Sequence, residues 1–288
     1  MTTQRALITG ASSGLGKALV LEMANEGYEV ILVGRDQKKL NDVINEAPTE
    51  VQKRMRGYCA DLSSDHQVLN LWARCQSLFG DSRPIDLLIN CAGYAVTGRV
   101  EDIPIEDFER CWKVNFSSAV SLVQQALPSM RASGQGIIVN VGSGVARRSL
   151  PFTSPYCAAK AALLSFTDSL RVEVAPENIT VLLFSPGPVA SGFHDATVHR
   201  GSHPMQFPAF HGQPAEKIAR VLIRAIKARK TRVVLGGRAS VAHHLNYWFP
   251  RFTDWLIGRM YRVGESSVTA TEVPPHSVAV SSLRGPKV

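Results

Sequence analysis

Tyr156 and Lys160 lie four residues apart in the stretch SPYCAAKAAL. On a helix this spacing puts both side chains on one face. A phenol with a pKa of about 10 is a weak acid or base at neutral pH, and an ammonium group beside it lowers that pKa by favouring the phenolate. The pair therefore predicts proton transfer to or from a substrate oxygen. Cys157 has no histidine partner in the order of a catalytic triad, so we interpret it as core filling.

Two polar residues precede this pair in the chain. Ser143 follows residues 136–142, an apolar run typical of a buried parallel strand. A strand of that kind ends at the edge of the sheet where binding crevices form, so the Ser143 hydroxyl can donate to the oxygen that Tyr156 protonates. Asn115 lies near the middle of a predicted long helix.

A glycine-rich stretch, TGASSGLG at residues 9–16, follows an apolar strand and opens a helix. Gly10, Gly14 and Gly16 let the backbone turn sharply and approach a pyrophosphate, which would rest on the N–H groups of the helix N-terminus. Glycines are also common in ordinary turns, but the position after the first strand of a βαβ unit favours a dinucleotide.

The ends of the next two predicted strands carry charged residues that select a coenzyme. Arg35 comes first after one strand and favours the 2′-phosphate of NADP, while Asp36 behind it keeps NAD open as an alternative. Asp61 ends the third predicted strand and can accept a hydrogen bond from the adenine amine. We therefore expect NADP (NADPH) as the coenzyme.

The elements that must position these residues alternate between strand and helix. Strands are predicted over 5–9, 29–34, 56–62, 85–90, 136–142, 179–185 and 231–236, and helices over 35–47, 65–79, 154–175 and 215–229, besides those around Gly14 and Asn115. Such alternation requires right-handed crossovers and a parallel sheet covered on both faces. The predicted fold class is a doubly wound α/β fold of the Rossmann type, with three α/β/α layers.

Three regions are predicted along the chain: a Rossmann-type catalytic domain over 1–238, an amphipathic helical extension over 239–263, and a disordered tail over 264–288. Within the first, residues 187–214 are rich in glycine, proline and histidine, which predicts an irregular substrate loop. The histidines there (His194, His199, His203 and His211) lack flanking cysteines and helical H-x-x-x-H spacing, so no metal site is predicted.

Composition narrows the class of protein. The net charge is +8, but residues 217–262 alone hold eleven basic residues and one acid, so the rest of the chain is slightly acidic. This distribution argues against a general nucleic-acid-binding surface. Five cysteines without a C-x-x-C pair suggest neither disulfides nor zinc, and no apolar run approaches a membrane span. We expect a cytoplasmic protein.

Residues 241–263 place tryptophans and other apolar residues at spacings of three and four, with arginines among them. This pattern predicts an amphipathic helix, or two halves broken near Pro250. Packing against the domain or another subunit is one interpretation. Peripheral contact with a membrane surface or a lipid substrate is the other, because Trp, Tyr and Arg together suit an interface.

The motifs occur in an order that resembles the short-chain dehydrogenase/reductase family over about residues 5–236. The matching pieces are TGASSGLG, NCAG (90–93), Asn115, Ser143, YCAAK (156–160) and SPGPVAS (185–191). Two positions depart from the family pattern. Cys91 stands where a second asparagine is usual, and Ser191 where threonine is usual, which weakens the support around the cofactor but leaves a hydroxyl for the nicotinamide carboxamide.

The resemblance implies a role for each matching residue. Tyr156 is the acid/base, Lys160 also binds the nicotinamide ribose, Ser143 polarises the carbonyl, and Asn115 holds a water that relays protons to Lys160. The implied cofactor site is made by Gly10, Ser12, Ser13, Gly14, Leu15, Gly16, Arg35, Asp61, Leu62, Asn90, Ala92, Gly93, Tyr156, Lys160, Pro186, Gly187, Val189 and Ser191.

The expected reaction interconverts a ketone or aldehyde and an alcohol by hydride transfer. Arg147 and Arg148 can engage an acidic substrate or be solvated, and the C-terminal segment favours a hydrophobic or lipid-like ketone. A β-ketoacyl thioester reductase and a non-catalytic NAD(P)-binding sensor or scaffold remain the alternatives. The family resemblance also implies a homodimer or homotetramer.

Overall fold

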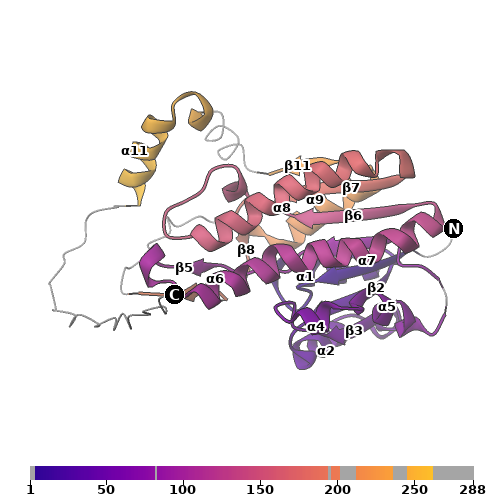
Figure 1. Cartoon of the computed structure of the whole chain (residues 1–288). Coiled ribbons are helices and arrows are strands. Elements are labelled where there is room, and N and C mark those ends of the chain that lie inside the picture. Colours follow the sequence, from indigo (N-terminus) through magenta and orange to yellow (C-terminus); the bar gives the residue numbers. More distant parts are fainter. Residues whose placement is uncertain (1–3, 82, 194–195, 202–211, 236–244, 262–288) are drawn as a thin grey trace, which may run out of the picture.

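The computed structural model of the chain describes residues 4–81, 83–193, 196–201, 212–235 and 245–261. Among these, seven parallel strands form one sheet in the order β11-β7-β6-β4-β1-β2-β3 (Figure 1). The strands are β1 Arg5–Thr9, β2 Glu29–Gly34, β3 Met55–Cys59, β4 Leu87–Asn90, β6 Gly136–Val141, β7 Ile179–Ser185 and β11 Arg232–Val234. The predicted doubly wound parallel sheet is confirmed.

Helices cover both faces of this sheet (Figure 1). They are α1 Gly14–Asn25, α2 Gln37–Asn45, α3 Thr49–Gln52, α4 Asp65–Val68, α5 Leu71–Gln76, α6 Ile105–Trp112, α7 Ser118–Ser133, α8 Ser154–Glu173, α9 Ala215–Lys227 and α11 Pro250–Met260, with short 3₁₀ turns at 77–79, 100–102, 144–146 and 175–177. Helices α1, α2 and α9 pack on one face, and α5, α7 and α8 pack on the other.

Side chains alternate between the two faces along each central strand. In β1, Ala6 and Ile8 join the core beneath α1 and α9, while Leu7 joins the core beneath α5, α7 and α8. All three are fully buried. Because each face is covered, both sets of positions must be apolar, which explains the continuous apolar runs in the sequence.

The strand order reverses between β1 and β4, so the loops that follow these two strands diverge and leave a crevice at the carboxyl edge of the sheet. The Thr9 hydroxyl at the end of β1 joins the two loops. It accepts hydrogen bonds from the backbone N–H groups of Cys91 and Ala92, at 3.0 and 3.1 Å. The glycine loop and the NCAG segment therefore lie side by side at the switch point.

The predicted helix over 65–79 is wrong as a single helix, because the chain breaks between α4 and α5. Asn70 there has a left-handed φ of 62°. Gln125 of α7 satisfies both broken ends: its Nε2 donates to the Val68 carbonyl at 3.0 Å, and its Oε1 accepts from the Trp72 N–H at 3.2 Å. A tertiary partner thus replaces the missing helical hydrogen bonds.

The predicted irregular loop over 187–214 contains more regular structure than expected. Strand β8 (Val189–Ala190) pairs with β10 (Gln213–Pro214), and β5 (Val96–Thr97) pairs with β9 (Val198–His199). The second pairing ties the loop to the segment after NCAG. Of the histidines considered above, His199 bonds Thr97 through Nδ1 at 2.7 Å, and the other three lie outside the described residues.

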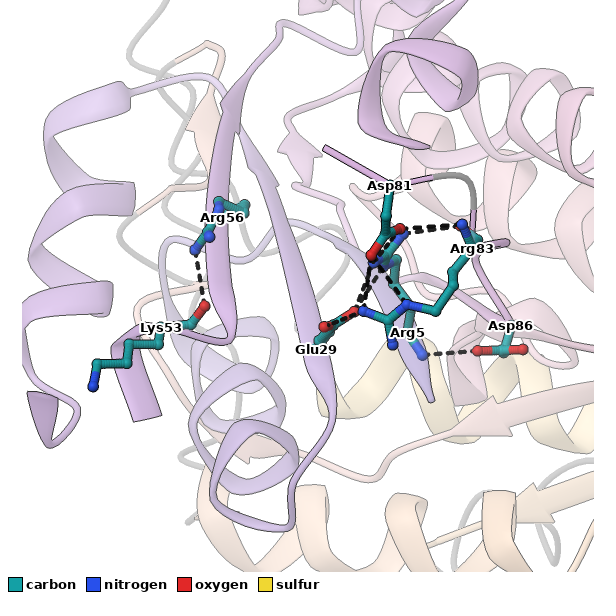
Figure 2. Close-up of polar contacts among 7 residues, drawn as sticks. All are labelled: Arg5, Glu29, Lys53, Arg56, Asp81, Arg83 and Asp86. Atoms are coloured by element: carbon teal, nitrogen blue, oxygen red, sulfur yellow. Dashed lines mark hydrogen bonds and ion pairs between the residues drawn. The ribbon is translucent and has the colours of Figure 1, made fainter. Parts of the chain in front are cut away.

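The amino edge of the sheet, opposite the crevice, is held by an ion network (Figure 2). The Arg5 side chain is 1% exposed and donates to Glu29 at 2.7 Å and to Asp81 at 3.0 Å. Arg83 also bonds Glu29, at 2.6 Å, and the Arg5 guanidinium stacks over the Phe79 ring at 4.4 Å. This network joins the starts of β1 and β2 to the segment that leads into β4.

Helix α11 stands apart from the three layers, beyond the carboxyl edge of the sheet (Figure 1). Residues 245–248 are also helical, and the break falls at Phe249, which confirms the predicted alternative of two halves near Pro250. Residues 239–244 and 262–263 of the predicted extension, and the predicted tail over 264–288, lie outside the described residues. Within the described part of the chain, no helix is long and apolar enough to cross a membrane.

Candidate active site

Helix α8 carries Tyr156 and Lys160 at its amino-terminal end. Pro155 lies in the first turn, where backbone N–H groups have no partner within the helix. Because proline has no N–H, it is well suited to this position. The Lys160 side chain turns inward, is only 4% exposed, and donates from Nζ to the Val141 carbonyl of β6 at 3.0 Å. Its Nζ lies 5.8 Å from the centre of the Tyr156 ring. The two side chains thus share one face, as their spacing predicts.

Burial opposes charge on both groups. It lowers the pKa of Lys160 from 10.5 to about 8, and it raises the pKa of Tyr156 well above 10. The expectation that the tyrosine pKa is lowered is therefore not met in the chain by itself, where desolvation outweighs the hydrogen bond with Ser143. The expectation concerned a site that also holds the positive nicotinamide ring. In the chain alone, Tyr156 is a neutral phenol at pH 7.

Ser143 lies one residue beyond Gly142, just past the end of β6, so its hydroxyl is at the carboxyl edge of the sheet. A hydrogen bond with Ser143 opposes the effect of burial on the Tyr156 pKa. The same hydroxyl accepts weakly from the Val145 N–H at 3.4 Å. Ser143 and Tyr156 can therefore contact one substrate oxygen together.

Asn115 sits in one turn of π-helix, residues 113–117, between α6 and α7. The predicted long helix is thus interrupted at the residue predicted to be functional, as is common for π-turns. Its Nδ2 donates to the carbonyls of Tyr94 and Cys111, both at 2.9 Å. Its Oδ1 is buried and accepts no hydrogen bond from the described residues. Such an acceptor calls for a polar partner.

Gly93 brings this acceptor close to the Lys160 amine. A Cβ atom at Gly93 would lie 2.6 Å from Asn115 Oδ1 and 3.5 Å from Lys160 Nζ. Only glycine leaves that space open. Asn115, Gly93 and Lys160 therefore surround one small polar volume at the floor of the crevice, which fits the proton relay implied for Asn115.

The glycine loop is shaped for close approach of a ligand. Gly10 and Gly14 have positive φ values of 68° and 52°, which favour glycine. A Cβ at Gly10 would lie 2.7 Å from Ala92 Cα, and one at Gly14 would lie 2.8 Å from Ser191 Cβ. The loop therefore lies directly against the NCAG segment and against the SPGPVAS segment, which brings three distant motifs together around one space.

Arg35 and Asp36 differ in what their side chains do. Asp36 caps α2, since its carboxylate accepts from the Lys39 N–H at 3.1 Å. Arg35 is exposed at the end of β2 and contributes to the electrostatic field at Asp61. Burial tends to raise the Asp61 pKa, but hydrogen bonds from Ser63 and the charges of Arg110 and Arg35 outweigh it and lower that pKa. The Asp36 carboxylate therefore caps α2, and the Arg35 guanidinium is the exposed charge at the end of β2.

The remaining predicted cofactor residues fall at the same edge of the sheet. Leu15 and Leu62 are buried, Ser13 is exposed, and Ser12, Ala92, Pro186, Gly187 and Val189 are half-buried beside the crevice. Asn90 is buried at the end of β4, where its Nδ2 donates to Asn140 Oδ1 at 2.9 Å. Its Oδ1 is another buried acceptor without a hydrogen bond from the described residues.

Sequence reasoning missed three groups that support the site. These are the Thr9 hydroxyl, the Val141 carbonyl that holds Lys160, and the Asn140 side chain, which donates to Thr167 at 2.9 Å. Thr9 directly precedes Gly10, so its place at a strand end was a usable signal. A backbone carbonyl leaves no signal in a sequence. Cys157 is buried with its Sγ 3.2 Å from the Thr153 hydroxyl, and the described residues contain no metal-binding cluster.

Comparison with known proteins identifies the family. Residues 4–200 match the family model for short chain dehydrogenases. A probable short-chain type dehydrogenase/reductase, VdlC of Helicobacter pylori, is 38% identical over 65% of this chain and 66% of its own length. The ketoacyl reductase HetN of a Nostoc species is 29% identical over 94% of this chain and 88% of its own. The chain belongs to the short-chain dehydrogenase/reductase family of nicotinamide-dependent oxidoreductases.

Solved structures agree with this fold. A short-chain dehydrogenase from Streptomyces avermitilis superposes with a TM-score of 0.77 at 26% identity, covering 90% of this chain and 98% of that one. A 3-ketoacyl-(acyl-carrier-protein) reductase from Brucella melitensis, solved with NADH, gives 0.70 at 26% identity, over 82% and 98%. Solved neighbours thus include a nucleotide complex, which supports a nucleotide cofactor for the family fold.

Proposed function

We propose that this chain is an NADP-dependent oxidoreductase that interconverts a hydrophobic ketone or aldehyde and the corresponding alcohol, with Tyr156 as the acid/base. The observation that carries the proposal is the buried amine of Lys160, held by the Val141 carbonyl beside the Tyr156 ring. A buried amine is costly for a fold, since burial lowers its pKa to about 8. A lysine that only stabilised the fold would extend to solvent, so its burial beside a phenol favours a catalytic role.

The residues of the glycine loop fit a dinucleotide. Gly10 and Gly14 clear the space that a side chain would fill, and the first turn of α1 presents unpaired N–H groups to a pyrophosphate. Arg35 would hold the 2′-phosphate, because Asp36 caps α2 and leaves the guanidinium as the exposed charge at this strand end. When bound, the coenzyme supplies or accepts the hydride.

The chain's own residues then handle the oxygen and the proton. Ser143 donates a hydrogen bond to the carbonyl oxygen and polarises it. Tyr156 is a neutral phenol at pH 7 in the chain alone, which is the form needed to donate a proton to that oxygen during reduction. Lys160 then gives a proton to the phenolate that remains. A water molecule that donates a hydrogen bond to Asn115 Oδ1, which accepts none from the described residues, would return a proton to Lys160.

The substrate is proposed to be hydrophobic. Helix α11 turns large aromatic side chains outward at the end of the sheet that holds the crevice. Arg148 is paired with Asp254 of α11 at 2.6 Å, which weakens the interpretation of an acidic substrate site at Arg148. Arg147 forms no ion pair with another residue in the described part of the chain. A β-ketoacyl thioester is the second candidate, because the chain is similar to the ketoacyl reductase HetN and to the 3-ketoacyl-(acyl-carrier-protein) reductase of Brucella melitensis. A homodimer or homotetramer is proposed from the family.

The proposal is tested with Tyr156→Phe. We expect turnover to fall by about 10²- to 10⁴-fold, because proton transfer is lost, while the dissociation constant for NADPH stays within about threefold. Turnover is followed by the nicotinamide absorbance with a panel of short ketones, aldehydes and β-ketoacyl thioesters. The matched control is Cys157→Ala, the next residue on α8, which should leave turnover within about threefold.

Two outcomes would contradict the proposal. Full turnover in Tyr156→Phe removes the acid/base role, and NADPH binding by the natural chain without turnover on any carbonyl compound or alcohol would favour a sensor or scaffold.

A further inference from the structure

Helix α11 is covered along one narrow row of side chains. Thr253 and Tyr261 are buried, and Ile257 between them is half-buried, so the covered row follows i, i+4, i+8 spacing. Thr253 is 3% exposed and bonds Asn246 at 2.9 Å. Burial raises the pKa of Tyr261, and Cys157 of α8 adds to that rise, which places this row near the start of α8.

Large apolar side chains of α11 and of residues 247–249 directly before it are exposed. Trp248 is 71% exposed and Trp255 is 59% exposed, and Phe252 lies between them with its ring centre 5.9 Å from that of Trp255. We call this surface the α11 face; it comprises Tyr247, Trp248, Phe249, Phe252, Trp255, Leu256 and Met260, all of them exposed. A contiguous apolar surface of this kind on a water-soluble domain marks an interaction site.

Positive charge flanks the α11 face. Arg251 and Arg259 lie four residues before and after Trp255, so both project from the aromatic side of the helix. Both are exposed, and neither forms an ion pair with a residue in the described part of the chain. Asp254 is the single acid of α11, and Arg148 neutralises it. The face therefore combines an apolar centre with unneutralised cations.

We propose that the α11 face docks on the surface of an anionic membrane. Tryptophan and tyrosine partition to the headgroup boundary, and arginines beside them attract anionic lipid. A second copy of the chain fits less well, because a two-fold contact through this face would place Arg251 and Arg259 of both copies together without acids to pair them. The helix is too short to span the bilayer and lies on its surface.

Arg148, five residues after Ser143, forms an ion pair with Asp254 of α11 and so ties this helix to the carboxyl end of the sheet (Figure 1). The membrane would thus meet the enzyme where substrate enters. This last step rests on the proposed function: the substrate reached is a carbonyl compound dissolved in the bilayer.

The test uses the full chain and sedimentation with vesicles of phosphatidylcholine alone or mixed equally with phosphatidylserine. We expect binding to the mixed vesicles that weakens at high salt. Trp248→Ser with Trp255→Ser should weaken it at least about tenfold by removing apolar contact. Arg251→Glu with Arg259→Glu should abolish the preference for phosphatidylserine. The matched controls are Val100→Ser, 68% exposed elsewhere on the surface, and Lys38→Glu.

Three results would overturn the proposal: no sedimentation of the natural chain with mixed vesicles, equal loss in the control variants, or a dimer in solution that the tryptophan substitutions dissociate without any vesicle binding. Failure of the proposed function is seen separately, because Tyr156→Phe should bind vesicles normally and the tryptophan variant should reduce a short soluble ketone normally. Reduction of a long-chain ketone held in vesicles should be slower in the tryptophan variant than in the natural chain. Equal rates in the two proteins would contradict the proposal that the substrate is taken from the bilayer.

Discussion

At the scale of single residues, burial disfavours the charged form of both members of the proposed catalytic pair. Lys160 is buried without an acidic partner among the described residues, and its pKa falls to about 8 because water is excluded. Tyr156 is held neutral for the same reason. A positively charged coenzyme ring would lower the Tyr156 pKa, and a phenolate forming on Tyr156 would raise the Lys160 pKa. Both pKa values would therefore move toward the range that proton transfer needs.

The Lys160 amine predicts a pH-dependent stability. Its folded-state pKa of about 8 lies below the ordinary 10.5, so the folded chain loses this proton at a lower pH than the unfolded chain. Stability therefore rises with pH between about 8 and 10.5 relative to a neutral variant, by about 3 kcal/mol in the free energy of unfolding. Urea unfolding of the natural chain and of Lys160→Met across this range measures the difference.

The control for this measurement is Lys17→Met, an exposed lysine paired with Glu46, which should follow the natural chain to within about 1 kcal/mol. Parallel curves for the natural chain and Lys160→Met would mean that the amine keeps its ordinary pKa and is not desolvated.

Arg35 carries a prediction about the coenzyme. Replacing it in Arg35→Asp removes the cation proposed for the 2′-phosphate and adds a carboxylate that suits ribose hydroxyls. The dissociation constant for NADPH should rise at least about tenfold, while that for NADH should stay level or fall. Fluorescence titration of both coenzymes checks this without turnover. Lys38→Asp, one turn along, is the control, and an unchanged ratio between the coenzymes would refute the NADP assignment.

At the scale of elements, the two edges of the sheet have different tasks. The carboxyl edge gathers the glycine loop and two buried acceptors, Asn90 Oδ1 and Asn115 Oδ1, that receive no hydrogen bond from the described residues. The amino edge carries the Arg5 network. Each guanidinium nitrogen of Arg5 donates to an oxygen of Glu29, Asp81 or Arg83. We interpret the network as the structural anchor of β1 and β2.

Removing one partner of this anchor should be costly. Glu29→Gln removes the carboxylate charge that pairs with the buried Arg5 guanidinium, so the buried cation is no longer fully compensated. We expect the free energy of unfolding to fall by about 3 kcal/mol. The matched change Glu50→Gln breaks an exposed pair with Lys53 and should cost less than about 1 kcal/mol. Urea unfolding at neutral pH compares them. Equal losses would show that burial of Arg5 adds nothing to the pair.

At the scale of the whole molecule, Figure 1 shows helix α11 beyond the carboxyl ends of the strands, at the end of the sheet opposite to the strand starts that the Arg5 network joins. The ion network lies at the amino edge, the proposed chemistry at the carboxyl edge, and the proposed membrane contact beyond it. This arrangement lets the proposed docking surface and the reacting groups be varied independently of the anchor, and each experiment above uses that separation.

The sequence by itself determined the sheet, because strands buried on both faces must be apolar along their whole length and the glycine loop needs residues that accept positive φ. It also placed Tyr156 and Lys160 on one face, since helical spacing is local. The tertiary structure decided what depends on distant partners. Gln125 splits the helix over 65–79, the Val141 carbonyl holds Lys160, and burial reverses the expected direction of the Tyr156 pKa. Desolvation and long-range hydrogen bonds arise only when the chain is folded, so no pattern of residue types contains them.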